Sequence, residues 1–218
     1  MPDSLLPKRF LFRFSTPCLY REKLWMAGGD ALDAKYRLTS FAELEGLATF
    51  ADVRAAWNES GMAITVRLGG KEQAPWCPTT RPEQTDGLHV WIDTRDVHNV
   101  HRASRFCHRF VFMPSGGGRR TDQPAALWLP INRARQHPQA IEDGGLKVQS
   151  EKRADGYLLD AFISADALTG FDPAEHPRLG FTYAVRDLER GEQTLAVGSP
   201  MPYEEDPSLW ATLELVRE

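Results

Sequence analysis

The segment that most constrains the fold is a short alternating run between two aspartates, from Asp86 to Asp93. Within it, three aliphatic residues alternate with His89 and Trp91. Successive side chains of a β-strand point to opposite faces, so the pattern predicts a strand with one apolar core face. We expect His89 and Trp91 to share the other face, where His89 would lie on an outer or concave surface available for binding.

Similar short runs recur along the chain, with few segments of helical period. Trp57, Trp128 and Trp210 fall within such runs and are expected in the core, while Ser164 is suited to cap one short helical turn. About ten short strands with long loops predict an all-β protein, a single antiparallel β-sandwich of jelly-roll or immunoglobulin-like kind. The expected strands are 9–15, 53–58, 62–68, 87–93, 105–113, 126–131, 146–151, 157–163, 179–186, 193–197 and 209–216, with a weaker candidate at 32–40.

Length and composition fit one β-sandwich domain spanning residues 1–218. A chain of 218 residues, 42% of them hydrophobic, is long enough to bury one large core. No linker divides residues 50–216. Residues 1–49 carry weaker signals, apart from the alternation of Phe10, Phe12 and Phe14, and we expect them to add edge strands to the sheets.

Charge and cysteine content exclude several classes of partner. A net charge of −4 argues against a nucleic-acid-binding surface. No apolar run approaches the roughly 18 residues that cross a bilayer. The N-terminus lacks the order of a signal peptide, which favours a cytoplasmic location unless a leader has been removed. The odd count of cysteines, without CxxC spacing, favours free thiols over a disulfide framework or a zinc site at Cys18, Cys77 and Cys107.

The order of strands resembles that of the family 9 carbohydrate-binding modules and their relatives among DOMON-type β-sandwiches. The resemblance covers roughly residues 50–216 and is carried by the segments 53–66, 86–93, 156–163, 179–187 and 209–215. It implies non-catalytic recognition of a mono- or oligosaccharide by aromatic stacking. The chain also lacks the G-x-S-x-G, H-E-x-x-H and Walker motifs that would indicate a common enzyme class.

The resemblance also implies a set of ligand-binding residues. In the family, two aromatic side chains from different loops enclose a sugar, and Trp76 and Tyr203 occupy comparable places in this sequence. Arg81, His89 and His108 are then expected to bind hydroxyl groups. The family commonly carries a glutamate where His89 stands, and a neutral imidazole offers only one donor and one acceptor, so specificity is altered or binding lost. Packing of Trp76 onto its own loop is the alternative.

A histidine- and aspartate-rich loop leaves other readings open. Some family members bind structural calcium through loop carboxylates and carbonyls, which makes Asp93 and Asp96 candidate calcium ligands. His98 and His101 lie nearby without diagnostic spacing, and we interpret them as solvated. One rival is an intracellular protein-interaction module that uses loops 69–85 and 94–104 to bind a protein partner. A second is a metal-assisted enzyme built on the His/Asp loop.

Overall fold

The computed structural model describes residues 8–26, 31–41, 44, 46–47, 49–199 and 201–217. This part of the chain contains no α-helix, and no helix in it is long and apolar enough to cross a membrane. The all-β class is therefore confirmed. The strands are β1 Ser15–Tyr20, β2 Ala51–Asn58, β3 Gly61–Leu68, β4 Gly87–Asp93, β5 Cys107–Gly117, β6 Gln123–Trp128, β7 Leu146–Arg153, β8 Gly156–Ser164, β9 Arg178–Asp187, β10 Gly191–Thr194 and β11 Ala211–Val216. Short 3-10 helices are η1 Lys8–Leu11, η2 Ala34–Tyr36, η4 Pro82–Gln84, η5 Ala165–Ala167 and η6 Pro207–Leu209.

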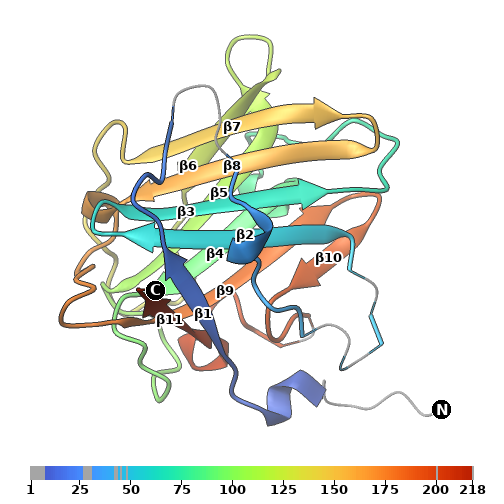
Figure 1. Cartoon of the computed structure of the whole chain (residues 1–218). Coiled ribbons are helices and arrows are strands. Elements are labelled where there is room, and N and C mark those ends of the chain that lie inside the picture. Colours follow the sequence, from blue (N-terminus) through green and yellow to red (C-terminus); the bar gives the residue numbers. More distant parts are fainter. Residues whose placement is uncertain are drawn as a thin grey trace.

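The eleven described strands form one sheet that curls into a nearly closed barrel (Figure 1). Ten of them follow the order β6-β5-β4-β9-β11-β1-β2-β3-β8-β7, and β10 pairs with β9. The sheet is mixed, because β1 runs parallel to both β11 and β2. The prediction of a purely antiparallel sheet is therefore wrong. The prediction that residues 1–49 supply edge strands is wrong for β1, which lies inside the sheet.

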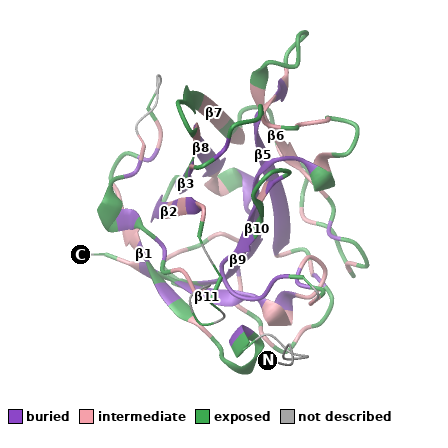
Figure 2. Ribbon diagram, turned by 90° about the vertical axis from the view of Figure 1, so that its right-hand side faces the viewer, coloured by how far each residue is buried: buried purple, intermediate pink, exposed green. Residues whose placement is uncertain are grey.

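The main core lies inside the curled sheet, where buried residues gather between its two halves (Figure 2). The apolar face of β4 enters this core, as the alternation predicts, and meets Phe110 and Phe112 of β5. Trp57 and Trp210 are buried, with 3% and 2% of their surface exposed. Trp128 is only partly buried and packs against the same core. The predicted burial is thus confirmed for Trp57 and Trp210, although Trp210 directly precedes β11 and does not lie within a strand.

The hairpin between β2 and β3 is confirmed. Asn58 pairs with Gly61, which leaves a two-residue turn at Glu59 and Ser60. The Asn58 side chain closes the turn by accepting a hydrogen bond from the amide nitrogen of Ser60 at 2.8 Å. Gly61 has φ of +137°, and a Cβ there would lie 2.0 Å from the carbonyl oxygen of Ile163. Only glycine fits this point of contact between β3 and β8.

The predicted strand at residues 9–15 is wrong. Residues Lys8–Leu11 form η1, and β1 begins only at Ser15. Phe10 and Phe12 are 40% and 62% exposed, so their alternation does not mark a buried face. The buried residue is Arg9, whose Nη1 lies 3.3 Å from both the carbonyl oxygen and Oγ1 of Thr194.

Two smaller predictions are confirmed. Ser164 caps η5, because its hydroxyl accepts a hydrogen bond from the amide nitrogen of Ala167 at 3.2 Å. The three cysteines are free thiols, and Cys18 and Cys107 are buried. Cys77 is only partly buried.

Candidate ligand-binding cleft

The face of β4 that carries His89 and Trp91 is covered rather than open. The segment between β10 and β11 packs over it, so that Tyr203 and Trp210 join Trp91 in a second buried cluster. His89 is fully buried as a result. The expectation that His89 lies on an accessible surface is therefore wrong, although its assignment to the face opposite the aliphatic residues is right.

The imidazole of His89 is held in place by contacts inside the protein. Its Nε2 lies 3.0 Å from the carbonyl oxygen of Thr85. Its ring stacks beside Trp91, with the centroids 6.2 Å apart. Burial lowers the pKa of His89 to about 3, and the positive charge of Arg186 acts in the same direction. His89 is accordingly a neutral, packed side chain.

His108 lies on the opposite side of the same sheet. The register pairs Ile92 with His108 and Trp91 with Arg109, so His108 faces the main core. It is fully buried and stacks on Phe110 at 5.8 Å between centroids. Burial lowers its pKa to about 4. His89 and His108 therefore cannot contact one ligand from the same face.

The sequence predicted His108 as a ligand-binding residue, but its neighbour Arg109 is the residue that lies on the same face of the sheet as Trp91. Its guanidinium lies 5.0 Å above the ring of Trp91, a cation–π contact on a buried aromatic surface. Its Nη2 forms an ion pair with Glu204 Oε2 at 2.7 Å. Burial lowers the pKa of Arg109, and Glu204 opposes that change.

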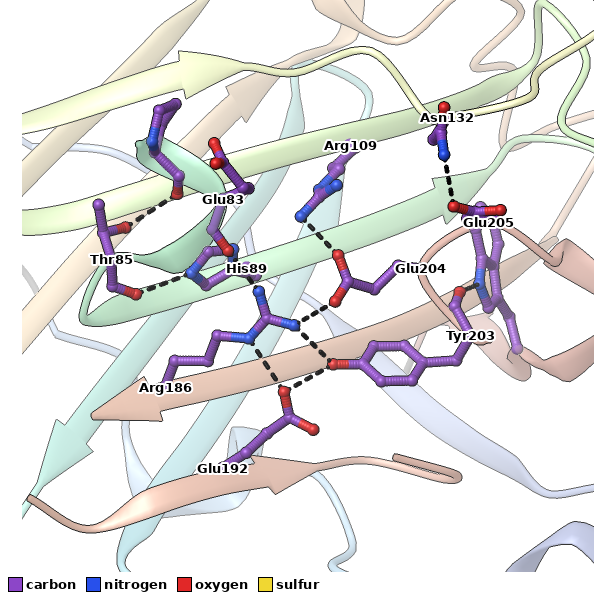
Figure 3. A network of polar contacts seen from close by, with 12 residues as sticks. Glu83, Thr85, His89, Arg109, Asn132, Arg186, Glu192, Tyr203, Glu204 and Glu205 are labelled. Atoms are coloured by element: carbon purple, nitrogen blue, oxygen red, sulfur yellow. Dashed lines mark hydrogen bonds and ion pairs between the residues drawn. The ribbon is translucent and has the colours of Figure 1, made fainter. Parts of the chain in front are cut away.

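Arg186, near the end of β9, connects this pair to a wider network (Figure 3). Its Nη2 lies 2.5 Å from Glu204 Oε1, and its Nε donates to Glu192 at 2.9 Å. Its Nη1 donates to the carbonyl oxygen of Glu83 at 2.6 Å. Burial alone would lower the pKa of Arg186, but the neighbouring Tyr203 and carboxylates raise it well above its usual value. One carboxylate, that of Glu204, thus bridges the buried guanidinium group of Arg109 and the partly buried one of Arg186.

Tyr203 fixes this network instead of offering a free ring. Only 2% of the residue is exposed, and its ring packs edge-on against Trp91 at 5.3 Å between centroids. Its hydroxyl donates to Glu192 at 2.9 Å and accepts from Arg186 at 3.0 Å. Burial raises the pKa of Tyr203, so the phenol stays protonated. The ring face expected to stack on a sugar is occupied within the protein.

The network forms the floor of a cleft of about 630 Å³, here called the charged cleft. This size is within the range of sites that hold small ligands. Asn132 Nδ2 donates to Glu205 at 2.6 Å on one rim. The lining holds four carboxylates and two guanidinium groups, from Glu83, Gln84, Arg109, Asn132, Arg186, Glu192, Ser199, Met201, Pro202, Tyr203, Glu204 and Glu205.

Trp76 and Arg81 lie in the loop before β4 and do not line this cleft. Trp76 is 41% exposed, whereas its backbone is fixed: its amide nitrogen donates to Asp86 Oδ2 at 2.9 Å. Arg81 is exposed. The same loop also contains Glu83 and Gln84, which do border the cleft. Of the five predicted ligand-binding residues, only Tyr203 is among its lining residues.

The carboxylates of Asp93 and Asp96 do not fit a calcium site. Asp93 accepts hydrogen bonds from the amide nitrogens of Arg95 and Val97, at 3.0 and 2.9 Å, which close the turn after β4. Asp96 contacts His98 at 2.8 Å and the Arg178 guanidinium at 3.3 Å. A resident cation beside Asp96 opposes a second one. Within the described residues, no group of three or more His, Cys, Asp or Glu is placed to hold a metal ion.

Sequence reasoning missed most of the charged cleft. The alternation of β5 does place Arg109 opposite Phe110, so one signal for it exists in the sequence. Glu204 and Glu205 are adjacent in the sequence but have different partners: Glu204 contacts Arg109, whereas Glu205 contacts Asn132. Their common use in one cleft depends on how the segment between β10 and β11 folds back, which local sequence does not encode.

Comparison with solved structures identifies similar folds. Two are carbohydrate-binding modules of family 9 from Caldicellulosiruptor kristjanssonii, one in complex with cellotriose and the other with glucose. The first has a TM-score of 0.64 at 12% sequence identity, covering 94% of this chain and 95% of that one. The second has a TM-score of 0.59 at 11% identity, covering 94% and 97%. The resemblance noted from the sequence is therefore confirmed for the fold.

No protein-family model matches the chain, and no curated protein matches it.

Proposed function

We propose that the protein is a non-catalytic carbohydrate-binding module that takes a mono- or oligosaccharide in the charged cleft. The observation that carries this proposal is the bridged pair Arg109–Glu204–Arg186, held at the floor of an open cleft in a fold similar to sugar-binding modules. Sugar hydroxyls need both donors and acceptors, and this cleft supplies both at fixed positions.

The carboxylates of the cleft retain capacity for a ligand. An ionised carboxylate has about four acceptor positions, and Glu204 uses one oxygen for each arginine. The side chains of Glu204, Glu205 and Glu192 are 35%, 32% and 27% exposed, so hydroxyl groups can reach them. Hydrogen bonds to ionised partners are the stronger kind. Because the protein already orders these side chains, a ligand loses little affinity to their immobilisation.

Aromatic stacking enters the proposal through Trp76. An exposed tryptophan is a suitable surface for the apolar face of a sugar ring. Its loop continues into Glu83 and Gln84 at the cleft rim, and its backbone is fixed by Asp86. Tyr203 contributes differently, since its hydroxyl holds Arg186 and Glu192 in place.

The test is calorimetric titration with glucose, cellobiose and cellotriose, followed by a wider glycan array. These probes come first because the similar structures hold glucose and cellotriose. Glu204→Gln keeps the shape of the side chain but removes the charge shared by Arg109 and Arg186, and we expect at least about tenfold weaker binding. Glu151→Gln is the matched control, because Glu151 is 63% exposed on β7, pairs with Arg153 and does not line the charged cleft.

Equal losses of sugar affinity in Glu204→Gln and Glu151→Gln would contradict a binding site in the charged cleft. Absence of binding to every sugar on the array by the wild-type protein would overturn the proposed function itself. A loss of affinity confined to Glu204→Gln, in a variant that still unfolds in one cooperative transition, is the expected result.

A further inference from the structure

A second hollow lies on the other side of the wall formed by Met201 and Pro202. These two residues line both the charged cleft and this hollow, which has a volume of about 560 Å³. We call it the aromatic groove, because Phe10, Phe12 and Phe14 line one side of it. The two hollows are thus neighbours that share one wall.

The aromatic wall presents rings to solvent. Phe12 is 62% exposed and Phe10 40% exposed, and Leu11 between them is 67% exposed. The wall is nevertheless tied to the barrel, because the buried Arg9 lies 3.3 Å from both oxygen atoms of Thr194 at the end of β10. Adjacent exposed apolar side chains held in one place indicate a contact surface for a partner or ligand.

The aromatic groove also contains polar groups. His101, Asp206 and Ser208 line it and contact one another. Asp206 Oδ2 and Ser208 Oγ both meet the same His101 nitrogen, Nδ1, at 3.0 and 3.1 Å, and Ser208 donates to Asp206 at 2.6 Å. This is not a hydrolase triad, in which serine and aspartate contact different nitrogens of the histidine. It is a fixed set of polar groups, with the His101 side chain 76% exposed.

A groove lined by both aromatic rings and polar groups suits a pyranose ring, whose C–H face is apolar and whose edge carries hydroxyls. We propose that the aromatic groove is a second sugar subsite, so that an oligosaccharide crosses the wall of Met201 and Pro202 and occupies both hollows. The ligand class is then a glycan of several units rather than a monosaccharide. This inference rests on the proposed function and adds chain-length selectivity to it.

Calorimetric titration with glucose and with cellooligosaccharides of increasing length tests the second subsite. The wild-type protein is expected to bind the longer chains about tenfold more tightly than glucose. Phe12→Ala is expected to remove that gain while leaving the affinity for glucose unchanged, and Phe10→Ala to reduce it. Leu188→Ala is the matched control, because Leu188 is an apolar residue with 70% exposure that lines neither hollow.

The outcomes separate the two proposals. If the wild-type protein binds neither glucose nor any longer chain, both proposals are wrong for these sugars. If it binds them but affinity does not rise with length, or the rise persists in Phe12→Ala, the second subsite is wrong and the charged cleft stands. Light scattering must show the same molar mass for wild type and Phe12→Ala. A variant that turns a dimer into a monomer would assign the phenylalanines to self-association and overturn the second subsite.

Discussion

Arg186 and Asp187 are adjacent on β9 and point to opposite faces of the sheet, where each belongs to a different charged cluster. The two clusters differ in their exposure to solvent. Arg186 points into the charged cleft, whereas Asp187 meets Lys71 Nζ at 2.7 Å in what we call the Lys71 cluster. The side chains of Lys71, Asp86 and Asp187 are 2%, 3% and 0% exposed. Glu204, which bridges the arginines of the cleft, is 35% exposed. Ion pairs of the same kind are therefore fully buried in one cluster and partly open to solvent in the other.

The Lys71 cluster fastens the loop before β4. Asp86 accepts hydrogen bonds from the amide nitrogens of Trp76 and Leu188, at 2.9 and 2.8 Å, and pairs with Lys71 at 3.3 Å. Burial raises the pKa of Asp86, and its backbone donors and Lys71 act against that rise. The cluster joins the loop to the turn after β9 and leaves no opening for a ligand. The comparison teaches that access to solvent, rather than charge, distinguishes the proposed sugar site from the anchor of the loop.

The largest effect is expected from Lys71→Met. The substitution leaves Asp86 and Asp187 buried without their cation, and breaking such a pair costs about 3–5 kcal/mol. Urea denaturation measures the loss of unfolding free energy. Lys152→Met on β7, where the side chain is exposed, is the control and should change it by less than about 0.5 kcal/mol. A loss below about 1 kcal/mol for Lys71→Met would contradict the role of anchor.

Acidification is expected to destabilise the fold through the two buried histidines. His89 and His108 have pKa values of about 3 and about 4 in the folded chain, below the unfolded value near 6.5. Between these values the unfolded chain binds more protons, so stability is lost as pH falls below about 6.5. At pH 5 the loss is about 2 kcal/mol for each histidine.

His108→Phe isolates the core-side histidine. Urea denaturation at pH 7.5 and pH 5 should show about half the histidine-dependent loss in this variant, since His89 still titrates. Its stability at pH 7.5 should be at or above that of the wild-type protein, because His108 is fully buried and stacked on Phe110. An unchanged pH dependence would show that His108 is not held neutral by burial.

Trp76→Ala distinguishes stacking on a sugar from packing onto the loop. With Trp76 as the stacking surface, cellotriose affinity should fall about tenfold while unfolding free energy changes by less than about 1 kcal/mol. With Trp76 as a packing residue, the unfolding free energy should fall by more than about 1 kcal/mol while cellotriose affinity stays unchanged. Calorimetry and urea denaturation of the same samples separate these results.

Tyr203→Phe is expected to give the smallest effect. It removes the hydroxyl that joins Arg186 to Glu192 but keeps the ring against Trp91. The expected cost is about 1 kcal/mol of unfolding free energy. Cellotriose affinity should fall less than in Glu204→Gln, because the bridging carboxylate remains. A larger binding loss than in Glu204→Gln would mean that the phenol itself contacts the sugar.

The sequence predicted those features that follow from local periodicity. The two faces of β4, the turn before Gly61 and the cap at Ser164 all depend on residues close together in the chain. It failed where distant strands meet. The parallel pairing of β1 with β11 and the covering of His89 depend on segments about 100 or more residues away, and no local pattern reports them.

The candidate site shows the same division. Residue types suited to sugar binding were expected at Trp76, Arg81, His89, His108 and Tyr203, and only Tyr203 lines the charged cleft. Arg109 and Arg186 come from β5 and β9, and Glu204 from the segment before β11. Their meeting depends on strand register, since a shift of one residue would turn Arg109 into the core.

The most direct test of the account is an NMR titration of the protein with cellotriose, following the guanidinium Nε–H signals of Arg109 and Arg186. Both groups contact Glu204, so a sugar bound in the charged cleft should shift both signals with one saturation curve. The indole signal of Trp76 should follow the same curve. Saturable binding that leaves both arginine signals unmoved would contradict the assignment of the charged cleft as the sugar site.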